Sequence, residues 1–386
     1  MNGDMIGRVI KGRYKLIDEL ARGSFATVYV ARDTENNRIY AVKIMHYELS
    51  NDGELLARFQ REAHILLNLS DPHIVRCVDY GNDGNIPFIV MDYVDGHTLK
   101  YHMITLGQME ALQALNYTHQ MVEGLDTAYK QGVIHRDIKP QNILINSKEV
   151  VKITDYGLAR SRETVTLTQS NVFMGTAYYI APEQAESGRS ADIRSDLYSV
   201  ATVLFEMLTG TPPFEGETAV DIVIKHMNDK VPSICRIRPD LPTDMDIFFQ
   251  KAMAKSPRDR YTTPQEFLAV LEQIQEGVQA MPQLVGSKPA REQNKRHAGS
   301  AEKPNTAPQK QGRLVVLSSG QTIPLNGELM VVGRQDPILG IFPEISLADK
   351  TVGRRHAYLR NQQGTFTVED LNALNKTRLN GAILTP

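Results

Sequence analysis

The sequence predicts an α+β chain with a small sheet-rich lobe, a larger helical lobe and a separate β-rich module. Short alternating apolar segments fill residues 14–94, whereas helical spacing prevails in residues 95–275, mainly from residue 112 onward. Strands followed by helices are typical of this fold class. Residues 276–312 are rich in Pro, Gln, Lys and Ser without periodicity, which predicts a flexible linker. Alternation returns in residues 313–386, and a chain of 386 residues exceeds what one core usually supports.

Three strands and one helix are predicted in the small lobe. The strands cover Tyr14–Ile17, Thr27–Ala31 and Ile39–Ile44, separated by turns rich in Gly, Asn and Asp. Between Leu55 and Leu67 apolar residues recur at helical spacing, and Asp71-Pro72 ends the run.

The larger lobe and the C-terminal module follow the same two periodicities. Ser195–Leu208 predicts a nearly all-apolar helix that carries a carboxylate, Asp196, near its start. In the C-terminal module, Leu314–Leu317, Leu329–Val332 and Phe366–Glu369 alternate as strands between Gly/Asn turns.

Composition limits the cellular context. The net charge is −2, so nothing in it favours nucleic acid or an anionic membrane surface as a partner. Cys77 and Cys235 are the only cysteines, and without a signal peptide they predict a reducing, cytoplasmic location. No apolar run approaches the ~20 residues of a membrane-spanning helix. The sequence favours no particular oligomeric state.

The run His135–Asn142 places an acid, a cation and a carboxamide at fixed intervals, and Asp155 follows within the next strand and turn. This grouping suits phosphoryl transfer from a magnesium-bound nucleotide to a hydroxyl. Asp137 can orient the hydroxyl and take its proton, and Lys139 can neutralise the transferring phosphate. Asn142 and Asp155 can hold the metal ion.

In these residues the sequence resembles the eukaryotic-like protein kinases, most closely their bacterial serine/threonine branch. The resemblance runs from about Tyr14 to Leu271, with the motifs in the family's order. It implies the two-lobed kinase fold, ATP and Mg²⁺ as cofactors, and Ser/Thr hydroxyls of proteins, including its own, as acceptors. Thr176 together with Lys139 marks the serine/threonine class. Tyr156 replaces the usual Phe of the metal-binding triplet, and it can fill the same apolar slot if its hydroxyl finds a partner.

The resemblance implies an ATP site in the small lobe. The covering hairpin comprises Leu20, Ala21, Arg22, Gly23, Ser24, Phe25, Ala26 and Val28. The family pattern has three glycines, which admit phosphates close to the backbone, but here Ala21 and Ala26 replace the first and third. On its own this segment predicts only a hairpin, and Lys43 at the expected distance supports the functional interpretation. By resemblance, Lys43 forms an ion pair with Glu62 of the intervening helix.

The remaining nucleotide contacts are also implied by resemblance. Met91 lines the back of the adenine pocket, and backbone groups of Asp92 and Val94 bond the adenine edge. Ala41 and Leu144 complete the apolar walls. Met91 is equally consistent with simple core packing.

The activation segment of the resemblance runs from Asp155 to Glu183. Arg136 is expected to attract a phosphate on this segment. Thr168 and Ser170 occupy the usual positions of the phosphoacceptors in the bacterial relatives. Thr164 and Thr166 are further candidate acceptors.

Three architectural residues, Glu183, Arg260 and Asp196, complete the implied kinase core. Glu183 is expected to form a buried ion pair with Arg260, and Asp196 to brace the backbone of the catalytic loop. Loss of one partner of such a pair costs about 3–5 kcal/mol.

The C-terminal module resembles the forkhead-associated (FHA) domains, β-sandwiches that bind phosphothreonine peptides. By resemblance, Arg334 and Arg354 contact the phosphopeptide, His356 braces a loop and Asn375 bonds the peptide backbone. The sequence departs from the FHA family pattern at two positions. Gly353 stands where the family has a phosphate-binding serine, and Lys376 stands where it has a turn glycine. A β-module without a ligand is the alternative. The family continues for further strands beyond the last residues here, which predicts an incomplete sandwich.

Two other functions compete with a protein kinase. A pseudokinase scaffold that recruits partners through its C-terminal module is supported only by Ala21 and Ala26. A small-molecule phosphotransferase of related fold lacks the segment Gly175–Glu183, which docks a polypeptide. The sequence therefore favours a protein kinase with a phosphothreonine-binding module.

Overall fold

The computed structural model describes most of the first 280 residues and short parts of the last 75. The described residues are 5–23, 25–50, 52–156, 176–186, 191–280, 312–315, 322–325, 329–333, 345–347, 352, 356–362, 365–370, 377–379 and 382–383. They belong to two compact units, Met1–Gln283 and Leu284–Pro386. Among them, no helix combines the length and the apolar character needed to cross a membrane.

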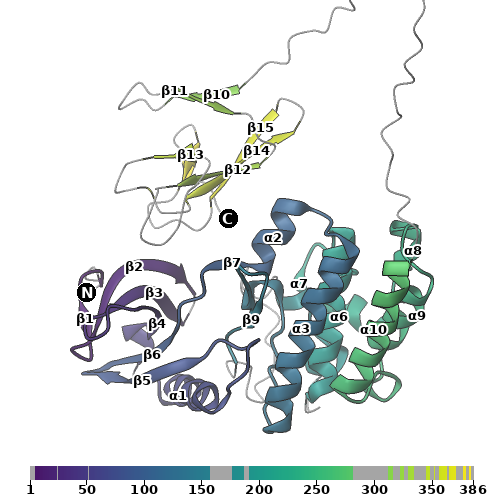
Figure 1. Ribbon diagram of the computed structural model, residues 1–386, viewed down its shortest axis with the longest axis horizontal. Helices are drawn as coiled ribbons and strands as arrows, with labels where there is room; N and C mark the ends of the chain where they lie inside the picture. Colours follow the sequence, from purple (N-terminus) through teal and green to yellow (C-terminus); the bar gives the residue numbers. More distant parts are fainter. Residues whose placement is uncertain are drawn as a thin grey trace, which may run out of the picture. The chain divides into compact units, whose positions relative to one another are not determined.

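A six-stranded antiparallel sheet forms the small lobe, in the order β1-β2-β3-β4-β6-β5 (Figure 1). Its strands are β1 (Val9–Ile10), β2 (Tyr14–Arg22), β3 (Ala26–Asp33), β4 (Ile39–Met45), β5 (Cys77–Asp83) and β6 (Ile86–Asp92). The short helix η1 (Tyr47–Leu49) and the helix α1 (Gly53–Asn68) follow β4. The three predicted strands and the predicted helix are confirmed.

Strand alternation decides where the lysine of β4 points. Val42 and Ile44 belong to one buried cluster, and Ala41 and Met45 belong to another that includes residues of α1. Because side chains alternate along a strand, Lys43 shares the face of Ala41 and Met45. The β-strand pattern thus directs this lysine toward α1.

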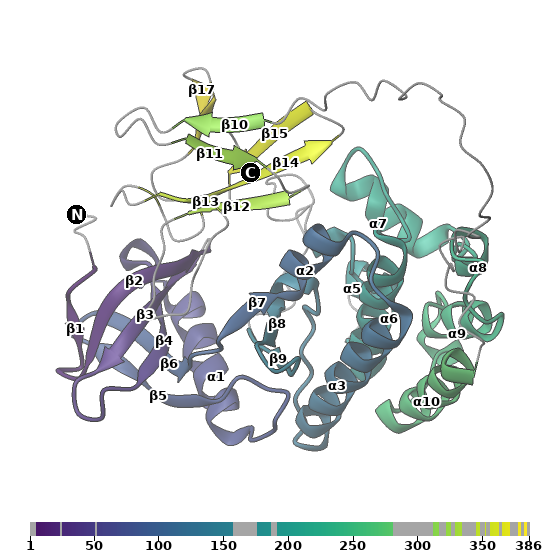
Figure 2. The same cartoon turned by 45° about the horizontal axis from the view of Figure 1, so that its top comes forward.

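The larger lobe contains a small sheet and most of the helices (Figure 2). The sheet has the order β7-β8-β9, with strands β7 (Gly96–Thr98), β8 (Ile143–Asn146) and β9 (Val151–Ile153). The helices are α2 (Leu99–Leu106), α3 (Ala111–Lys130), η2 (Pro140–Asn142), α5 (Pro182–Ala185), α6 (Ile193–Thr209), α7 (Ala219–Asn228), α8 (Ile234–Ile237), α9 (Asp244–Ala252), η3 (Pro257–Asp259) and α10 (Pro264–Ala280).

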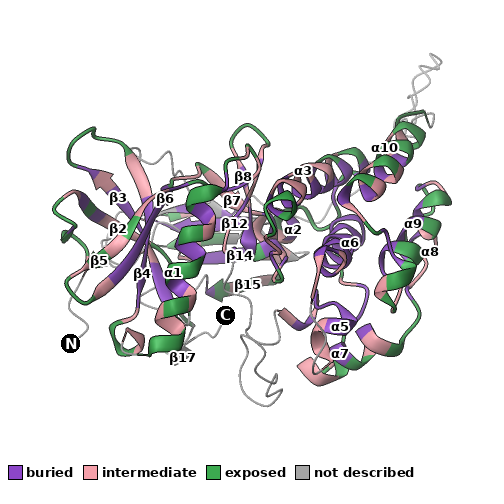
Figure 3. Cartoon of the chain, turned by 90° about the horizontal axis from the view of Figure 1, so that it is seen from below, coloured by how far each residue is buried: buried purple, intermediate pink, exposed green. Residues whose placement is uncertain are grey.

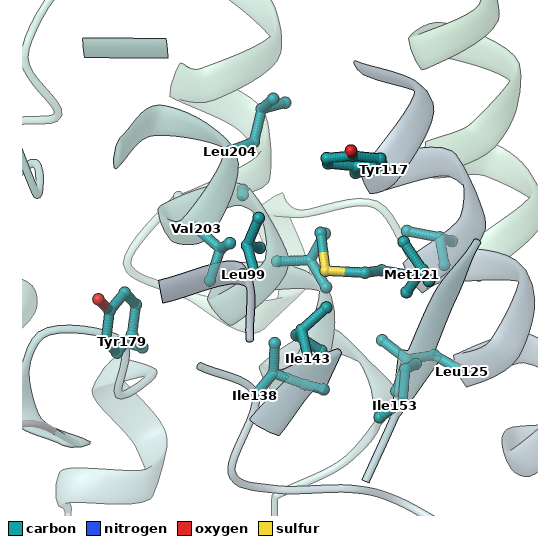
Figure 4. Packing of buried hydrophobic residues seen from close by; sticks show 14 of the residues in the cluster. Leu99, Tyr117, Met121, Leu125, Ile138, Ile143, Ile153, Tyr179, Val203 and Leu204 are labelled. Atoms are coloured by element: carbon teal, nitrogen blue, oxygen red, sulfur yellow. The ribbon is translucent and has the colours of Figure 1, made fainter. Parts of the chain in front are cut away.

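Helix α6 is the centre of this lobe, and it is buried along nearly its whole length (Figure 3). The Asp192 side chain caps its first turn, and Gly210 ends it in the left-handed conformation, φ 78°. The core around it combines side chains of α2, α3, α6, β8, β9 and the loop between α3 and β8 (Figure 4). These include Leu99, Tyr117, Met121, Leu125, Ile138, Ile143, Ile153, Tyr179, Val203 and Leu204. The predicted apolar helix is confirmed.

The second unit is built of β-strands in its described parts. β10 (Gly312–Val315) pairs with β11 (Thr322–Leu325), and a four-stranded sheet has the order β13-β12-β14-β15. Its strands are β12 (Leu329–Gly333), β13 (Ile345–Ser346), β14 (Ala357–Gln362) and β15 (Thr365–Asp370), and β16 (Arg378–Leu379) pairs with β17 (Ala382–Ile383). Its small core comprises Leu325, Met330, Val332, Ile345, Ala357 and Leu359. The predicted α+β fold class, with a β-rich C-terminal module, is confirmed.

Candidate active site

The catalytic loop between α3 and β8 brings an acid, a cation and an amide together. Lys139 Nζ donates to Asp137 Oδ2 at 2.8 Å. The amide nitrogen of Asn142 donates to the main-chain oxygen of Asp137 at 2.9 Å and to its Oδ2 at 3.2 Å. The predicted trio therefore forms one hydrogen-bonded cluster, and the half-buried Asp137 carboxylate retains access to solvent.

Helix α6 holds the start of this loop. The carboxylate of Asp196 accepts the backbone N–H of His135 at 2.8 Å and that of Arg136 at 2.7 Å. Asp196 is buried, and Arg136 adopts φ 68°, which L-residues rarely adopt. The expected brace by Asp196 is confirmed.

A second cluster joins the two lobes through one lysine. Lys43 Nζ on β4 donates to Glu62 Oε1 of α1 at 2.8 Å and to Asp155 Oδ1 at 2.7 Å. The side chains of Lys43 and Glu62 are almost fully buried. The predicted Lys43–Glu62 ion pair is confirmed, and the direct bond to Asp155 was not predicted.

Burial and charge shift the pKa values in this cluster in different directions. Burial raises the pKa of the Glu62 carboxyl to about 7, and the Lys43 ammonium opposes part of that rise. Burial alone would also raise the pKa of Asp155, but the charge and hydrogen bond of Lys43 hold it below its usual range. Lys43 stays protonated because its two acidic partners raise its pKa in spite of burial.

Asn142 and Asp155 present oxygen atoms that suit a magnesium ion. Among the described residues, the side-chain oxygen of Asn142 accepts no hydrogen bond, and only Oδ1 of the Asp155 carboxylate has a partner. The two residues lie close together, because Thr154, which directly precedes Asp155, donates its N–H to the main-chain oxygen of Asn142 at 3.0 Å. Carboxylate and amide oxygens are the ligands that Mg²⁺ prefers. This donor set fits the ion.

Tyr156 is fully buried directly after Asp155. Its ring lies edge-on to that of His135, with 4.6 Å between the ring centroids. Its hydroxyl is buried and has no hydrogen-bond partner in the described structure. Tyr156 therefore fills the expected apolar slot, but the expected partner for its hydroxyl is missing among these residues.

The hairpin β2–β3 is closed by the N–H of Gly23, which donates to the main-chain oxygen of Ala26 at 2.9 Å. Leu20 and Phe25 are exposed apolar residues at its end, and Ser24 lies outside the described residues. Ala26, which replaces a glycine of the family pattern, is buried in the main core cluster. Its methyl group therefore has a packing role that glycine would not fulfil.

The side chains predicted to surround the adenine share one apolar cluster. Ala41 and Met91 are buried in it, and the partly buried Val28, Val94 and Leu144 pack against it. The N–H of Asp92 donates to the main-chain oxygen of Arg76 at 2.9 Å, so this N–H is not available to a ligand. Within the described structure the backbone groups of Val94 have no hydrogen-bond partner.

The last part of the activation segment, residues 176–183, is held by a contact at each of its two ends. Lys139 Nζ also donates to Thr176 Oγ1 at 3.2 Å. Arg260 donates two hydrogen bonds of 2.7 Å to the buried carboxylate of Glu183, which confirms the predicted ion pair. The candidate phosphoacceptors Thr168 and Ser170 lie outside the described residues.

Two further contacts of this segment were not predicted from the sequence. Glu206, buried on α6, accepts from Tyr179 Oη at 2.6 Å and from Lys100 Nζ at 2.9 Å. His226 of α7 binds the main-chain oxygen of Tyr178. For the first contact the sequence held one signal, the carboxylate of Glu206 in a largely apolar helix.

In the second unit, the predicted ligand-binding residues Arg334, Arg354 and Asn375 lie outside the described residues. His356 is described, and its N–H donates to the main-chain oxygen of Val332 at 2.8 Å. Its position beside β12 is compatible with the bracing role implied by resemblance.

Comparison with known proteins identifies both units. The protein kinase domain family matches residues 14–272, and the FHA domain family matches residues 330–386. The serine/threonine-protein kinase PrkC of Bacillus subtilis is 40% identical over 265 residues, which are 69% of this chain and 41% of that protein. PknB of Mycobacterium tuberculosis is 38% identical over 275 residues, 69% of this chain and 44% of that protein.

A solved structure shows the same architecture. The crystal structure of the Mycobacterium tuberculosis PknI kinase domain aligns with a TM-score of 0.56 at 27% identity, covering 69% of this chain and 98% of that one. The chain spans about two fifths of the length of the curated relatives it matches. It belongs to the protein kinase family, is related to bacterial serine/threonine-protein kinases, and carries an FHA-domain match after its kinase domain.

Proposed function

We propose that this chain is a protein kinase that transfers the γ-phosphate of ATP to Ser/Thr hydroxyls of proteins, including its own. The contact of Lys139 with both Asp137 and Thr176 carries the proposal. One cation thus bonds both the candidate base and the end of the activation segment. A small-molecule phosphotransferase does not dock a polypeptide, so the contact favours a protein kinase over that alternative. Because the predicted catalytic side chains are all present, the pseudokinase alternative has no support.

Asp137 would orient the acceptor hydroxyl and take its proton as the oxygen attacks the γ-phosphorus. A new oxygen–phosphorus bond forms, the bond to the bridging oxygen breaks, and ADP leaves. Lys139 would neutralise charge on the phosphoryl group in transit. Asn142 and Asp155 would hold Mg²⁺, which when bound neutralises phosphate charge. Lys43, kept in place by Glu62, would bind the α- and β-phosphates.

ATP would bind between the hairpin of the small lobe and β8 of the larger lobe. The adenine would be enclosed by Met91, Ala41, Val28, Val94 and Leu144. The carbonyl of Asp92 and the unpaired backbone groups of Val94 would bond the adenine edge, as their contacts allow. The hairpin residues Leu20 to Ala26 would cover the phosphates.

Two further proposals follow from the family matches. Phosphorylation of Thr168 or Ser170 would create an anion for the Arg136 guanidinium and order the activation segment. The FHA-like unit would bind phosphothreonine peptides through Arg334, Arg354 and Asn375. Both cysteines are free thiols, which is consistent with a reducing compartment such as the cytoplasm.

Substitution of the candidate base tests the main proposal. Asp137→Asn keeps the side-chain shape but removes the proton acceptor, so phosphate incorporation from ATP into a protein acceptor should fall by about 10²- to 10⁴-fold. Incorporation is measured with radiolabelled ATP and Mg²⁺, and the sites are mapped by mass spectrometry. Asp240→Asn, at an exposed carboxylate, is the matched control and should retain full activity. Near-parental transfer by Asp137→Asn would show that Asp137 is not the base.

A further inference from the structure

Buried side chains hold two successive carbonyl groups near the end of the activation segment. We call residues 176–181 the docking segment. The main-chain oxygen of Tyr178 accepts from Nε2 of His226, on α7, at 3.0 Å. The main-chain oxygen of Tyr179 accepts from Oγ of Ser199, on α6, at 2.7 Å. The backbone of the docking segment is therefore bonded to two different helices.

The ring of His226 has a single hydrogen-bonding arrangement. A carbonyl oxygen only accepts, so the proton of the neutral ring lies on Nε2, and Nδ1 accepts from the hydroxyl of Tyr198 at 2.8 Å. The ring is fully buried and lies edge-on to Phe214, with 4.9 Å between the centroids. Burial and the nearby Lys255 ammonium lower the pKa of His226 to about 3, so the ring is neutral at pH 7. Each ring nitrogen thus has one fixed role.

Helix α7 is itself a firm support for this ring. Lys255 Nζ donates to the main-chain oxygen of His226 at 2.8 Å and to that of Lys225 at 3.4 Å, which satisfies carbonyl groups at the end of the helix. Apolar side chains of the docking segment and α7 form one buried cluster, comprising Ala177, Ile180, Ile222 and Val223. The His226 bond is therefore the polar part of a packed interface.

The same segment reaches the reacting groups. Thr176, two residues before Tyr178, accepts a hydrogen bond from Lys139, which also binds Asp137. A displacement of the Tyr178 carbonyl would move Thr176 relative to these two side chains. The adenine and the α- and β-phosphates of ATP would bind to other residues, in the small lobe and at Lys43, and His226 bonds none of these in the described structure.

We propose that His226 is a positioning residue for the polypeptide substrate. By holding the Tyr178 carbonyl, it keeps the docking segment in the conformation that presents an acceptor hydroxyl to Asp137. The inference rests on the proposed kinase function. It separates peptide binding from ATP binding, because the side-chain and ring contacts of His226 are with Tyr178, Tyr198 and Phe214, none of which is a proposed ATP ligand.

Paired substitutions in the full chain test this role. In His226→Gln the carboxamide reaches about as far as Nε2 and keeps a donor for Tyr178. In His226→Asn it reaches only to Nδ1, so the Tyr178 bond is lost. Steady-state kinetics with a threonine peptide and Mg-ATP should show a five- to tenfold higher peptide KM for His226→Asn and an unchanged KM for ATP. His226→Gln should stay within twofold of the parent chain.

Tyr198→Phe is the matched control for stability. It removes a buried hydrogen bond of the same ring but leaves the Nε2 donor in place, so the melting temperature should fall while the peptide KM stays unchanged. If His226→Asn does not fold, His226→Phe, which keeps the ring volume against Phe214 and lacks the donor, should show the same rise in peptide KM.

The outcomes separate the two proposals. An unchanged peptide KM in the variants without the donor, or an equal rise in Tyr198→Phe, overturns the positioning role alone. A parent chain that transfers no phosphate to any protein or peptide overturns the kinase proposal and this inference with it.

Discussion

Replacing Tyr156 by Phe should stabilise the kinase unit. The Tyr156 hydroxyl is buried without a hydrogen-bond partner in the described structure, and a buried unsatisfied polar group costs about 1–3 kcal/mol. Phe keeps the ring packed against His135 and removes only this oxygen. With a gain of about 1 kcal/mol, the melting temperature of a unit of this size should rise by roughly 2–4 °C.

Tyr179→Phe is the matched control, because the same chemical change should have the opposite sign there. The Tyr179 hydroxyl donates to the buried Glu206 carboxylate at 2.6 Å, and such charge-assisted bonds contribute about 1.5–3 kcal/mol. Loss of this bond should lower the melting temperature by several degrees, because each kcal/mol of lost stability lowers the melting temperature of a unit of this size by roughly 2–4 °C.

Differential scanning calorimetry of the full chain, with the kinase transition followed in both variants, makes the comparison. A lower melting temperature for Tyr156→Phe would show that the hydroxyl has a bonding partner and would refute the reasoning.

Two further perturbations test the ion pairs. Arg260→Ala leaves the Glu183 carboxylate buried and unpaired, so urea titration should show a loss of about 3–5 kcal/mol in unfolding free energy. Arg8→Ala, in the exposed pair with Asp83, should cost at most about 1 kcal/mol, and equal losses would contradict the argument from burial. For Glu62, burial raises the folded pKa to about 7, so between about pH 4.5, the unfolded value, and pH 7 the folded state binds more protons. The stability that this raised pKa contributes is complete below pH 4.5 and is lost as the pH rises through 7. In Glu62→Gln the unfolding free energy should therefore vary less with pH between 4.5 and 7. An unchanged slope of unfolding free energy against pH would refute the raised pKa of Glu62.

The sequence predicted most of what depends on local pattern and motif order. Alternation in β4 places Lys43 on the face toward α1, and the helical spacing around Glu62 puts that residue on the buried side. Asp196 was identifiable because it is a carboxylate near the start of a largely apolar helix. Each of these signals lies within one element, where residue spacing fixes the direction of a side chain.

Contacts between distant elements could not be predicted in the same way. The bond between Lys43 and Asp155 joins residues 112 positions apart, and its existence depends on how the lobes are placed. His226 and Ser199 donate to backbone carbonyls, which every residue carries, so nothing in the acceptor sequence marks the site. The unpartnered hydroxyl of Tyr156 is likewise a property of its surroundings.

The brace by Asp196 has a consequence for how the loop behaves as the protein warms. Arg136 is held at φ 68°, a conformation that costs an L-residue about 1–2 kcal/mol. Two hydrogen bonds from the loop to α6 offset that cost only while the helix stays in place. The helix is among the most buried parts of the kinase unit, and segments tied to the deepest core open only when the whole unit opens. The start of the catalytic loop should therefore exchange its amide hydrogens as slowly as the core itself, although it lies beside a surface that must admit substrates.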